Sequence, residues 1–447
     1  MKQNHALKLS FQLAWPISLQ QVLMTMLGMI DVMMVGHLGN SAVAAVGLGN
    51  RVQFVILVIF AGLGTALSIL SSQYWGAKNV NGIRSAIVLA STTGAALLLP
   101  LIIALFLFAE SIIAWGTNDA EVIALGADYI RLTIPALIFS YLLMVFEASL
   151  RSVGQVKTPL VISAIAVIAN ILMNWVFIFG AGPVPAMGVA GAAIATSVAR
   201  AFHLAMLVGY LIWRRHLVLP RVESFAIVHS LSAWRRYLTI SLPMMLNFGI
   251  WSSGTFVYAI LYGRVSTEAL AVASMLAPVE GILISLFFGM ASASAIMVGH
   301  QLGANNHQQA WNLAKNFALF CPIVAVLVGG LLALNIDLVL MPYNNLDTST
   351  IDQARQIIIL IAAFSWLKIT NMTLSMGVLR TGGQNKYCLL SDTFGMWCIG
   401  IPMTVIAVYL DWGFFYIYLM VYTEEVTKAV LFVRKLIQKT WMQTLAA

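Results

Sequence analysis

The chain has 447 residues, of which 61% are hydrophobic and only 9% are charged, with a mean hydropathy of +0.91. Soluble globular proteins carry about 25% charged residues, so this composition excludes a folded soluble enzyme. A transmembrane helix needs about 20 apolar residues, and the length therefore allows roughly a dozen spans joined by short loops. The composition predicts an all-α integral membrane protein with many spans.

The formal net charge of +8 does not indicate a nucleic-acid partner. Phosphate binding needs clustered Lys and Arg, whereas here the basic residues lie at intervals between apolar segments, where they set membrane topology. The three cysteines, Cys321, Cys388 and Cys398, all lie inside apolar runs. They offer neither a disulfide framework nor a CxxC metal pair, so we expect no metal and no nucleic acid.

Apolar segments long enough to cross a membrane recur along the whole chain. We expect twelve transmembrane helices, at residues 11–36, 47–73, 85–108, 122–146, 159–180, 188–213, 237–262, 270–299, 313–334, 353–376, 388–410 and 413–433. Several exceed 20 residues, which implies tilted helices or ends buried in protein.

Lys and Arg are distributed unevenly between alternate loops. One set comprises the N-terminus, the loops after the even-numbered spans and the C-terminal tail. It holds Lys2, Lys8, Lys78, Arg84, Arg151, Lys157, Arg214, Arg215, Arg221, Arg235, Arg236, Arg380, Lys386, Arg434, Lys435 and Lys439. The opposite loops hold Arg264 and several acidic residues. The positive-inside rule then predicts that both termini lie in the cytoplasm. We expect the protein to lie in a bacterial inner membrane.

The two halves of the chain repeat one another. Two ungapped shifts superpose Pro16 on Pro243, Gly36 on Gly263, Gly62 on Gly289, Gly76-Ala77 on Gly303-Ala304, Arg151 on Arg380, Gly154-Gln155 on Gly383-Gln384 and Lys157 on Lys386. Shared Pro, Gly and Arg are harder to obtain by chance than shared apolar residues. We therefore predict two pseudo-symmetric six-helix bundles at 1–213 and 237–447. An amphipathic cytoplasmic linker, 214–236, joins them at the membrane surface.

This architecture favours transport. Six is an even number, so both halves enter the membrane from the same side and are related by an axis along the membrane normal. Parallel repeats of this kind commonly bind substrate between the halves and alternate its exposure. The sequence has no G-x-x-x-x-G-K-[ST], G-x-S-x-G or H-E-x-x-H motif, so transport is expected to use an ion gradient rather than ATP, without a cofactor.

Asp31 is the first charged residue within a predicted transmembrane helix, where a charge is energetically costly. Its sequence neighbours are Met, Ile and Val and supply no counter-charge. Because the ionised form is disfavoured in apolar surroundings, a carboxyl there can take up and release a proton near neutral pH. The alternative is a carboxylate near the outer interface, or one hydrogen-bonded to another helix for packing.

Further polar residues of the first half are compatible with a site. Asn170 and Asn174 are four residues apart, hence on one helical face, and can offer amide oxygens to a cation or hydrogen bonds to a neighbouring helix. Thr196 ends a small-residue stretch whose default role is close packing through Gly191. Pro16 removes a backbone hydrogen bond and acts either as a hinge or as a static kink.

The second half differs from the first at the position of Asp31. The repeat places Tyr258 there, so a cation that drives transport is expected to bind in the first half. Glu280 and Lys368 look deeply embedded, and pairing between them is one interpretation. The other embedded charges are Arg51, Arg131, Glu147, Arg200, Asp392, Glu424 and Glu425.

Several of these features together resemble the MATE (multidrug and toxic compound extrusion) family, over essentially the whole chain. They are Pro16 before Asp31, Asn170-x-x-x-Asn174 followed by Phe177-Ile178, Gly191-Ala-Ala-Ile-Ala-Thr196, and the paired Leu-Arg loops around Arg151 and Arg380. The lone first-half carboxyl is similar to the DinF-like branch rather than the NorM-like branch.

The resemblance implies a coupling site of Asp31, Asn170, Asn174 and Thr196, with Pro16 as the hinge at which the first helix bends when the Asp is protonated. Some relatives have Asp where this chain has Asn174. Loss of that second carboxylate weakens a Na⁺ site and favours H⁺, with Na⁺ as the alternative ion.

The sequence thus predicts a monomeric efflux antiporter that exchanges cationic or amphipathic drugs for H⁺ across the lipid membrane. One rival is a lipid-intermediate flippase of the same superfamily, which should show a strongly cationic cavity and usually extra helices. The other is an intramembrane lipid-modifying enzyme, which would need clustered catalytic residues at one depth.

Overall fold

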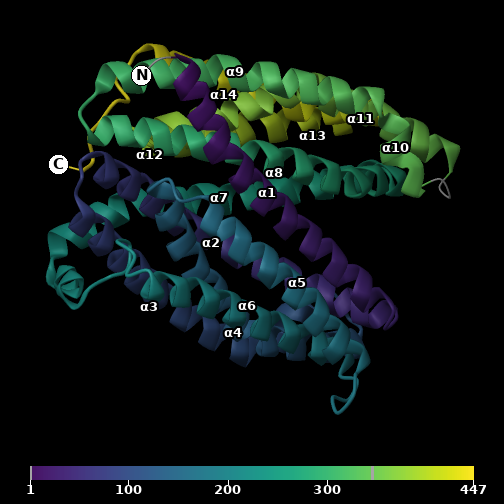
Figure 1. Cartoon of the computed structure of the whole chain (residues 1–447). Coiled ribbons are helices and arrows are strands. Elements are labelled where there is room, and N and C mark those ends of the chain that lie inside the picture. Colours follow the sequence, from purple (N-terminus) through teal and green to yellow (C-terminus); the bar gives the residue numbers. More distant parts are fainter. Residues whose placement is uncertain (1–2, 344–346, 447) are drawn as a thin grey trace. The chain divides into compact units, whose positions relative to one another are not determined.

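The computed structural model describes residues 3–343 and 347–446 and consists of helices joined by short connections (Figure 1). Within those residues the extended pairing is limited to an isolated bridge between Ala181 and Val184. The chain forms two compact units, Leu19–Met245 and Met1–Ser18 with Leu246–Ala447. The prediction of an all-α membrane protein is confirmed.

The unit Leu19–Met245 contains most of α1 and the start of α7. Helices α1 and α7 extend beyond the unit. The helices that contribute to it, in whole or in part, are α1 (Gln3–Gly36), α2 (Asn40–Gly76), α3 (Val80–Ala114), α4 (Ala120–Ser152), α5 (Lys157–Phe179), α6 (Gly188–Trp213), the 3₁₀ helix η1 (Val222–His229) and α7 (Leu231–Val265).

The other unit contains the start of α1, the rest of α7 and all later helices. These are α8 (Thr267–Gly303), α9 (His307–Leu334), α10 (Ile336–Leu340), η2 (Met341–Tyr343), α11 (Thr348–Met372), η3 (Thr373–Leu379), α12 (Asn385–Thr393), η4 (Phe394–Gly400), α13 (Ile401–Tyr409) and α14 (Phe414–Ile437). Helices η3 and η4 are π-helical and continue α11 and α12, respectively.

Eleven helices of the described residues are long and apolar enough to cross a membrane. The twelfth predicted span, 413–433, coincides with α14, which is more polar because it carries Glu424, Glu425 and Lys428. These side chains are nevertheless buried, with 4%, 8% and 6% of their surface exposed. Helix α14 therefore directs these three charges into the protein.

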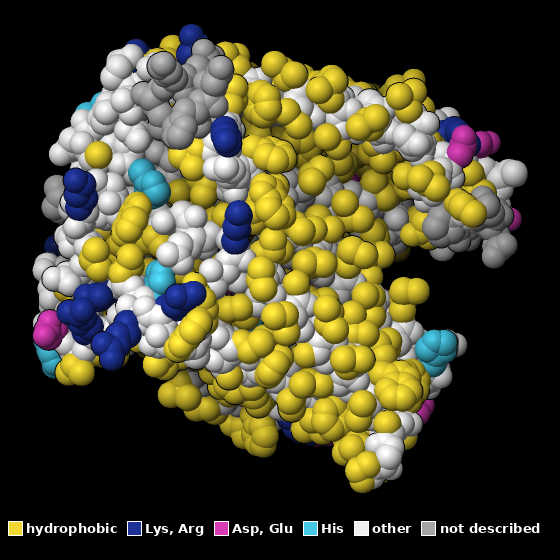
Figure 2. Space-filling model, viewed as in Figure 1, with side chains coloured by type: hydrophobic (Ala, Val, Ile, Leu, Met, Phe, Trp, Pro, Cys, Tyr) yellow, Lys and Arg dark blue, Asp and Glu magenta, His cyan; other side chains and the backbone are white. Residues whose placement is uncertain are grey.

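The outer surface of the helices is apolar. On α3, Leu99 and Leu107 are 62% and 63% exposed, and large apolar side chains are likewise exposed on α9. In each unit the viewed face is mostly hydrophobic, with most Lys and Arg side chains toward one end of the helices (Figure 2). Such a continuous exposed apolar surface fits contact with lipid.

The predicted repeat reappears in the backbone of the turns. Asn79 caps α3 by accepting a hydrogen bond from the Gly82 amide, and Asn306 caps α9 in the same way. Gly154 and Gly383 both adopt left-handed backbone conformations, at φ 82° and 86°, in the two Leu-Arg loops. Equivalent residues thus form equivalent turns in the two halves.

The linker between the predicted halves contains the 3₁₀ helix η1. Val222 and Phe225 of η1 are exposed, and the Arg84 Nε–H donates a hydrogen bond of 2.9 Å to the Leu217 carbonyl. An exposed apolar helix beside basic residues agrees with the amphipathic character predicted for 214–236.

The compact units do not end at the predicted lobe boundaries, because α1 and α7 each pass from one unit to the other. One boundary follows Ser18, just after Pro16, and the other follows Met245, just after Pro243. The sequence repeat superposes these two prolines, so the helices change unit at equivalent positions. The predicted lobes describe the repeat, whereas the compact units describe the packing.

The N-terminal parts of α1 and α7 each pack against a glycine, and the sequence repeat superposes these two glycines, Gly62 and Gly289. A Cβ at Gly289 on α8 would collide with the backbone of α1 at Ala14, and a Cβ at Gly62 on α2 would collide with the backbone of α7 at Met245. The Ser18 hydroxyl donates to the Leu286 carbonyl beside the first contact, and the Tyr237 hydroxyl donates to the Leu63 carbonyl beside the second. Helix backbones can approach this closely only where Cβ is missing.

We predict that Gly62→Val and Gly289→Val each destabilise the protein by at least about 1–3 kcal/mol, because the added side chain must displace a helix backbone. Thermal unfolding of the purified protein in detergent measures this as a lower midpoint. Gly281→Val on α8 is the matched control, since nothing lies within 4 Å of its Cβ position. An equal loss in all three variants would contradict the close-contact explanation.

Candidate functional site

Helices α1, α5 and α6 bring together the polar residues predicted for the first half. Asp31 lies on α1, Asn170 and Asn174 lie one turn apart on α5, and Thr196 lies on α6. Three of them, Asp31, Asn170 and Thr196, line one cavity of about 20 Å³. This volume admits a water molecule or a monatomic cation but no drug-sized molecule.

Asn174 joins these side chains by hydrogen bonds. Its Nδ2 donates to Asp31 Oδ1 at 2.6 Å and to Asn170 Oδ1 at 3.2 Å. Asn174 is only 1% exposed, and its Oδ1 accepts no hydrogen bond from the described residues. Asn174 therefore acts as a donor that holds the Asp31 carboxylate in place, and its carbonyl oxygen remains available to another donor or a cation.

Thr196 contributes to the cavity without contacting Asp31 directly. Its hydroxyl donates to the Ala192 carbonyl of its own helix at 3.0 Å, which leaves the oxygen lone pairs for other partners. Close packing brings this helix into place, because a Cβ at Gly191 would collide with the Phe177 carbonyl of α5. The predicted packing role of Gly191 thus also positions Thr196.

Arg200 corrects the expectation that Asp31 has no counter-charge. It lies one turn after Thr196 on α6, lines the same cavity as Asp31 and interacts electrostatically with it. Neighbours in the sequence do not reveal this partner, because it comes from another helix. An acid and a guanidinium that share a buried cavity lower each other's cost of burial.

Arg200 also faces a second acid, Glu147 on α4. Glu147 has further partners in Arg151 at 3.4 Å and His203 Nε2 at 3.5 Å. Ser163 donates to Glu147 at 3.4 Å. The first half therefore holds a partly buried network of two carboxyls, Asp31 and Glu147, with two guanidiniums and the buried imidazole of His203. The sequence indicates that Glu147 and Arg200 are embedded but not that they belong to the site. The i,i+4 spacing of Glu147 and Arg151 is the one local signal for an ion pair there.

The arrangement suits a proton or a single monovalent cation. Asp31, Asn170, Asn174 and Thr196 present oxygen atoms, which are suitable ligands for a hard cation. Arg200 beside them is already positively charged, which disfavours the binding of a cation with more than one charge. In the part of the chain that the structure describes, no group of three His, Cys, Asp or Glu side chains could hold a metal ion. A carboxyl that takes up a proton needs no such group.

The second half holds a larger cavity of about 240 Å³ with aromatic, methionine and charged walls. Lys368 Nζ lies 3.3 Å from Glu280 Oε2, so the pairing suggested by the sequence is confirmed. Arg380 Nη2 lies 3.1 Å from Asp392 Oδ2 and also donates to Asn247 Oδ1. This cavity is large enough for a small organic molecule, unlike the one beside Asp31.

Comparisons with known proteins agree with this fold and with the repeat. Residues 16–176 and 243–406 match the model of the family described as MatE, one match in each half. Multidrug and toxin extrusion protein 2 of Mus musculus is 27% identical over 410 residues, covering 88% of this chain and 67% of that protein. Probable multidrug resistance protein NorM of Thermotoga maritima is 24% identical, covering 89% and 84%.

Solved structures with the same fold cover nearly the whole chain. A crystal structure of a MATE protein in a bent conformation aligns with a TM-score of 0.88 at 19% identity, covering 98% of this chain and 96% of the other. A MOP superfamily transporter from Pyrococcus furiosus, described as having a binding pocket of reverse polarity, aligns with the same TM-score and identity.

We predict that Arg200→Met destabilises the protein more at alkaline than at acidic pH. Without this guanidinium, the ionised forms of Asp31 and Glu147 lose compensation, whereas their protonated forms do not. Thermal unfolding of the purified protein at several pH values measures the effect. Adding Asp31→Asn to Arg200→Met should restore part of the loss at high pH. A loss independent of pH would indicate a packing role for Arg200 instead.

Proposed function

The chain belongs to the MatE family, whose members are transporters and not enzymes, and we propose that it exports cationic or amphipathic toxic compounds in exchange for H⁺. One observation carries this proposal: Asp31 lies in a small cavity, bound to Asn174 and facing Arg200. A carboxyl in this position changes the charge of a partly buried network when it takes up or releases one proton.

The proposed exchange follows from the charge of that network. With Asp31 and Glu147 ionised, two carboxylates face the guanidiniums of Arg151 and Arg200, so the acids and bases balance. Protonation of Asp31 adds one positive charge, and binding of an organic cation also adds one. A low-dielectric interior penalises both additions together, so one event disfavours the other. Alternation between them is antiport.

Pro16 is the proposed hinge that links protonation to movement. As a proline within α1 it leaves the carbonyl one turn earlier without its helical partner, which loosens the helix there. The boundary between compact units falls just after it. Bending at this point on protonation of Asp31 would contract the first-half cavity and displace the substrate outward. The small volume beside Asp31 is consistent with a contracted cavity.

We propose H⁺ rather than Na⁺ as the coupling ion. Asn174 supplies an amide where a second carboxylate would strengthen a Na⁺ site, so Asp31 is the one carboxylate among the four predicted site residues. We further propose that the chain is DinF-like and monomeric, and that it lies in a bacterial inner membrane with both termini in the cytoplasm. The charge asymmetry of its loops supports that orientation.

We predict that Asp31→Asn reduces ΔpH-driven drug efflux to background, because the network can no longer exchange a proton at this position. The measurement is efflux of a fluorescent organic cation from proteoliposomes, with H⁺ and Na⁺ gradients imposed separately. Glu268→Gln, an exposed acid on α8, is the control and should transport normally. Full efflux by Asp31→Asn would refute the role of Asp31, and a strict Na⁺ requirement would refute H⁺ coupling.

We predict that Pro16→Ala lowers efflux several-fold while the protein stays folded and at least as thermally stable. Alanine restores the missing backbone hydrogen bond and stiffens α1. Pro100→Ala within α3 is the matched control, because this proline lies away from both unit boundaries. If Pro16→Ala transports at the wild-type rate, the proline is a static kink.

A further inference from the structure

The second half buries a group of charges that the proposed exchange at Asp31 does not use. This second-half charge cluster consists of Glu280, Lys368, Arg380, Asp392, Glu424, Glu425 and Lys428, which lie on or beside α8, α11, α12 and α14. Its members interact electrostatically across these helices, since Lys428 acts with Glu424, Glu425 and Asp392. The cluster holds four acids and three bases.

One acid in the cluster therefore has no base of its own. Glu280 pairs with Lys368 at 3.3 Å, and Asp392 pairs with Arg380 at 3.1 Å. The Lys428 ammonium pairs with both remaining carboxyls, at 3.1 Å from Glu424 and 3.4 Å from Glu425, and the Lys368 ammonium, already paired with Glu280, also acts on them electrostatically. An uncompensated charge in a membrane interior is costly, so this pair of neighbouring glutamates is the place where one proton restores neutrality.

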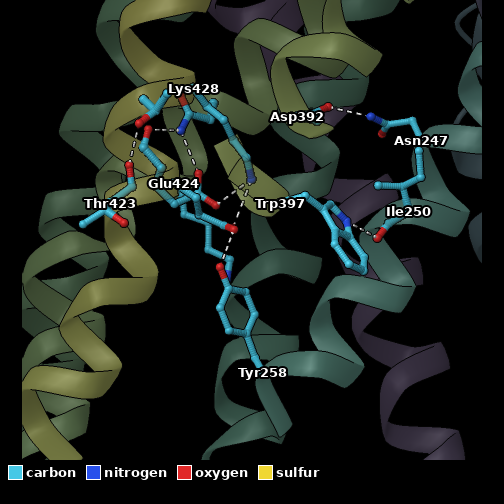
Figure 3. Close-up of polar contacts among 12 residues, drawn as sticks. Asn247, Ile250, Tyr258, Asp392, Trp397, Thr423, Glu424 and Lys428 are labelled. Carbon is cyan, nitrogen blue, oxygen red and sulfur yellow. Dashed lines mark hydrogen bonds and ion pairs between the residues drawn. The ribbon is translucent and has the colours of Figure 1, made fainter. Parts of the chain in front are cut away.

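Hydrogen-bond chemistry assigns that proton to Glu424. The Tyr258 hydroxyl lies 2.7 Å from Glu424 Oε2, and in Figure 3 Tyr258 points toward Glu424 and Lys428. A hydroxyl can donate to a carboxylate and, after rotation, accept from a carboxylic acid. Glu425 instead accepts from Asn371 Nδ2 at 2.7 Å, and both Lys428 and Lys368 act on it electrostatically, so its ionised form is better compensated than that of Glu424. Glu424 is thus the member of the pair whose charge has less compensation and whose hydroxyl partner, Tyr258, can accept its proton in a hydrogen bond.

The repeat relates this pair to the first-half site. Tyr258 occupies the position that the sequence repeat aligns with Asp31, and the shift that superposes the two Leu-Arg loops carries Thr196 onto Glu425. In the first half the acid stands on α1 and a neutral side chain on α6. In the second half the aligned acid is Glu425, the neighbour of Glu424 on α14, and the aligned neutral side chain is Tyr258 on α7. The second half therefore has its own titratable carboxyl, contributed by the opposite member of the helix pair.

Glycines and a cavity surround this carboxyl. A Cβ at Gly400 in the π-helical segment η4 would collide with the Tyr258 hydroxyl, and π-helical turns often occur at functional sites. Lys428, Glu425 and Asn371 line the 240 Å³ cavity. Asn371 is 4% exposed, and its Oδ1 accepts no hydrogen bond from the described residues. A molecule in this cavity would lie within reach of the pair.

We propose that Glu424, paired with Tyr258 and sharing Lys428 with Glu425, is a second proton-carrying site of this transporter, independent of Asp31. The proton adds to the Glu424 carboxylate from water, gives a carboxylic acid that donates to the Tyr258 oxygen, and returns to water when the cluster gains another positive charge. The described charged and titratable groups around it are Tyr258, Tyr262, Glu280, Lys368, Arg380, Asp392, Tyr418, Tyr422, Glu425 and Lys428.

Infrared spectroscopy of the purified full chain in liposomes, without any drug, tests this site. Between about pH 6 and pH 9 ordinary exposed Asp and Glu are ionised, so a carboxylic-acid C=O band reports a buried protonated carboxyl. Because Asp31 can also be protonated in this range, the variants are built on Asp31→Asn: we expect the band in Asp31→Asn, its loss on adding Glu424→Gln and a changed frequency on adding Tyr258→Phe. Adding Glu268→Gln, the exposed control, should keep the band. The band should persist in Asp31→Asn because the two sites are independent.

The excess of one acid over the bases in the cluster predicts a further result of the same infrared measurement. In the Asp31→Asn background, Glu425→Gln leaves three acids and three bases, so Glu424 should ionise and its band should disappear. Retention of the band in Glu424→Gln, or an unchanged frequency in Tyr258→Phe, would overturn the assignment to Glu424. Retention in Glu425→Gln would overturn the count. Because no transport is measured, these results stand apart from those on Asp31-driven efflux, and size-exclusion chromatography shows whether each variant is folded.

Discussion

A charge can lie inside a membrane protein only when neighbouring helices supply its partners, and this requirement determines much of the structure. Helix α14 is too polar to count as a span by hydropathy, yet its two glutamates and one lysine are buried because α7, α11 and one another satisfy them. Asp31 is held in the same way by α5 and α6. Partners placed on separate helices fix which faces of those helices meet.

The two halves meet this requirement with different charge counts. In the first half, two acids face two guanidiniums, so a proton or a cation adds charge to a balanced network. In the second half, four acids face three bases, so a proton completes the balance. The two halves thus share a fold but differ in the balance of acidic and basic side chains. The half with the excess acid contains the 240 Å³ cavity, whereas the cavity beside Asp31 has room for a water molecule or an ion.

Patterns local in the sequence predicted most of the fold. Hydropathy located the helices, and shared Pro, Gly and Arg revealed the repeat, which the turns at Gly154 and Gly383 reproduce. The i,i+4 spacing of Asn170 and Asn174 placed both on one face. The partners of Asp31 were only partly accessible, because Arg200 reaches it from a helix whose rotation the sequence does not specify. The link between Tyr258 and Glu424 depends on packing that brings two distant segments together, and no spacing rule encodes it.

The close contacts at Gly62 and Gly289 bear on how such a chain can be divided. The start of α1 packs on α8, and the start of α7 packs on α2, so each six-helix half lends its first turns to the compact unit of the other. A fragment that ends at the linker would contain Gly62 without its covering helix. The repeat suggests a duplicated six-helix ancestor, and for such an ancestor the same contacts would have been made between two identical copies. Exchange of helix starts would therefore have favoured a dimer before the two copies became one chain.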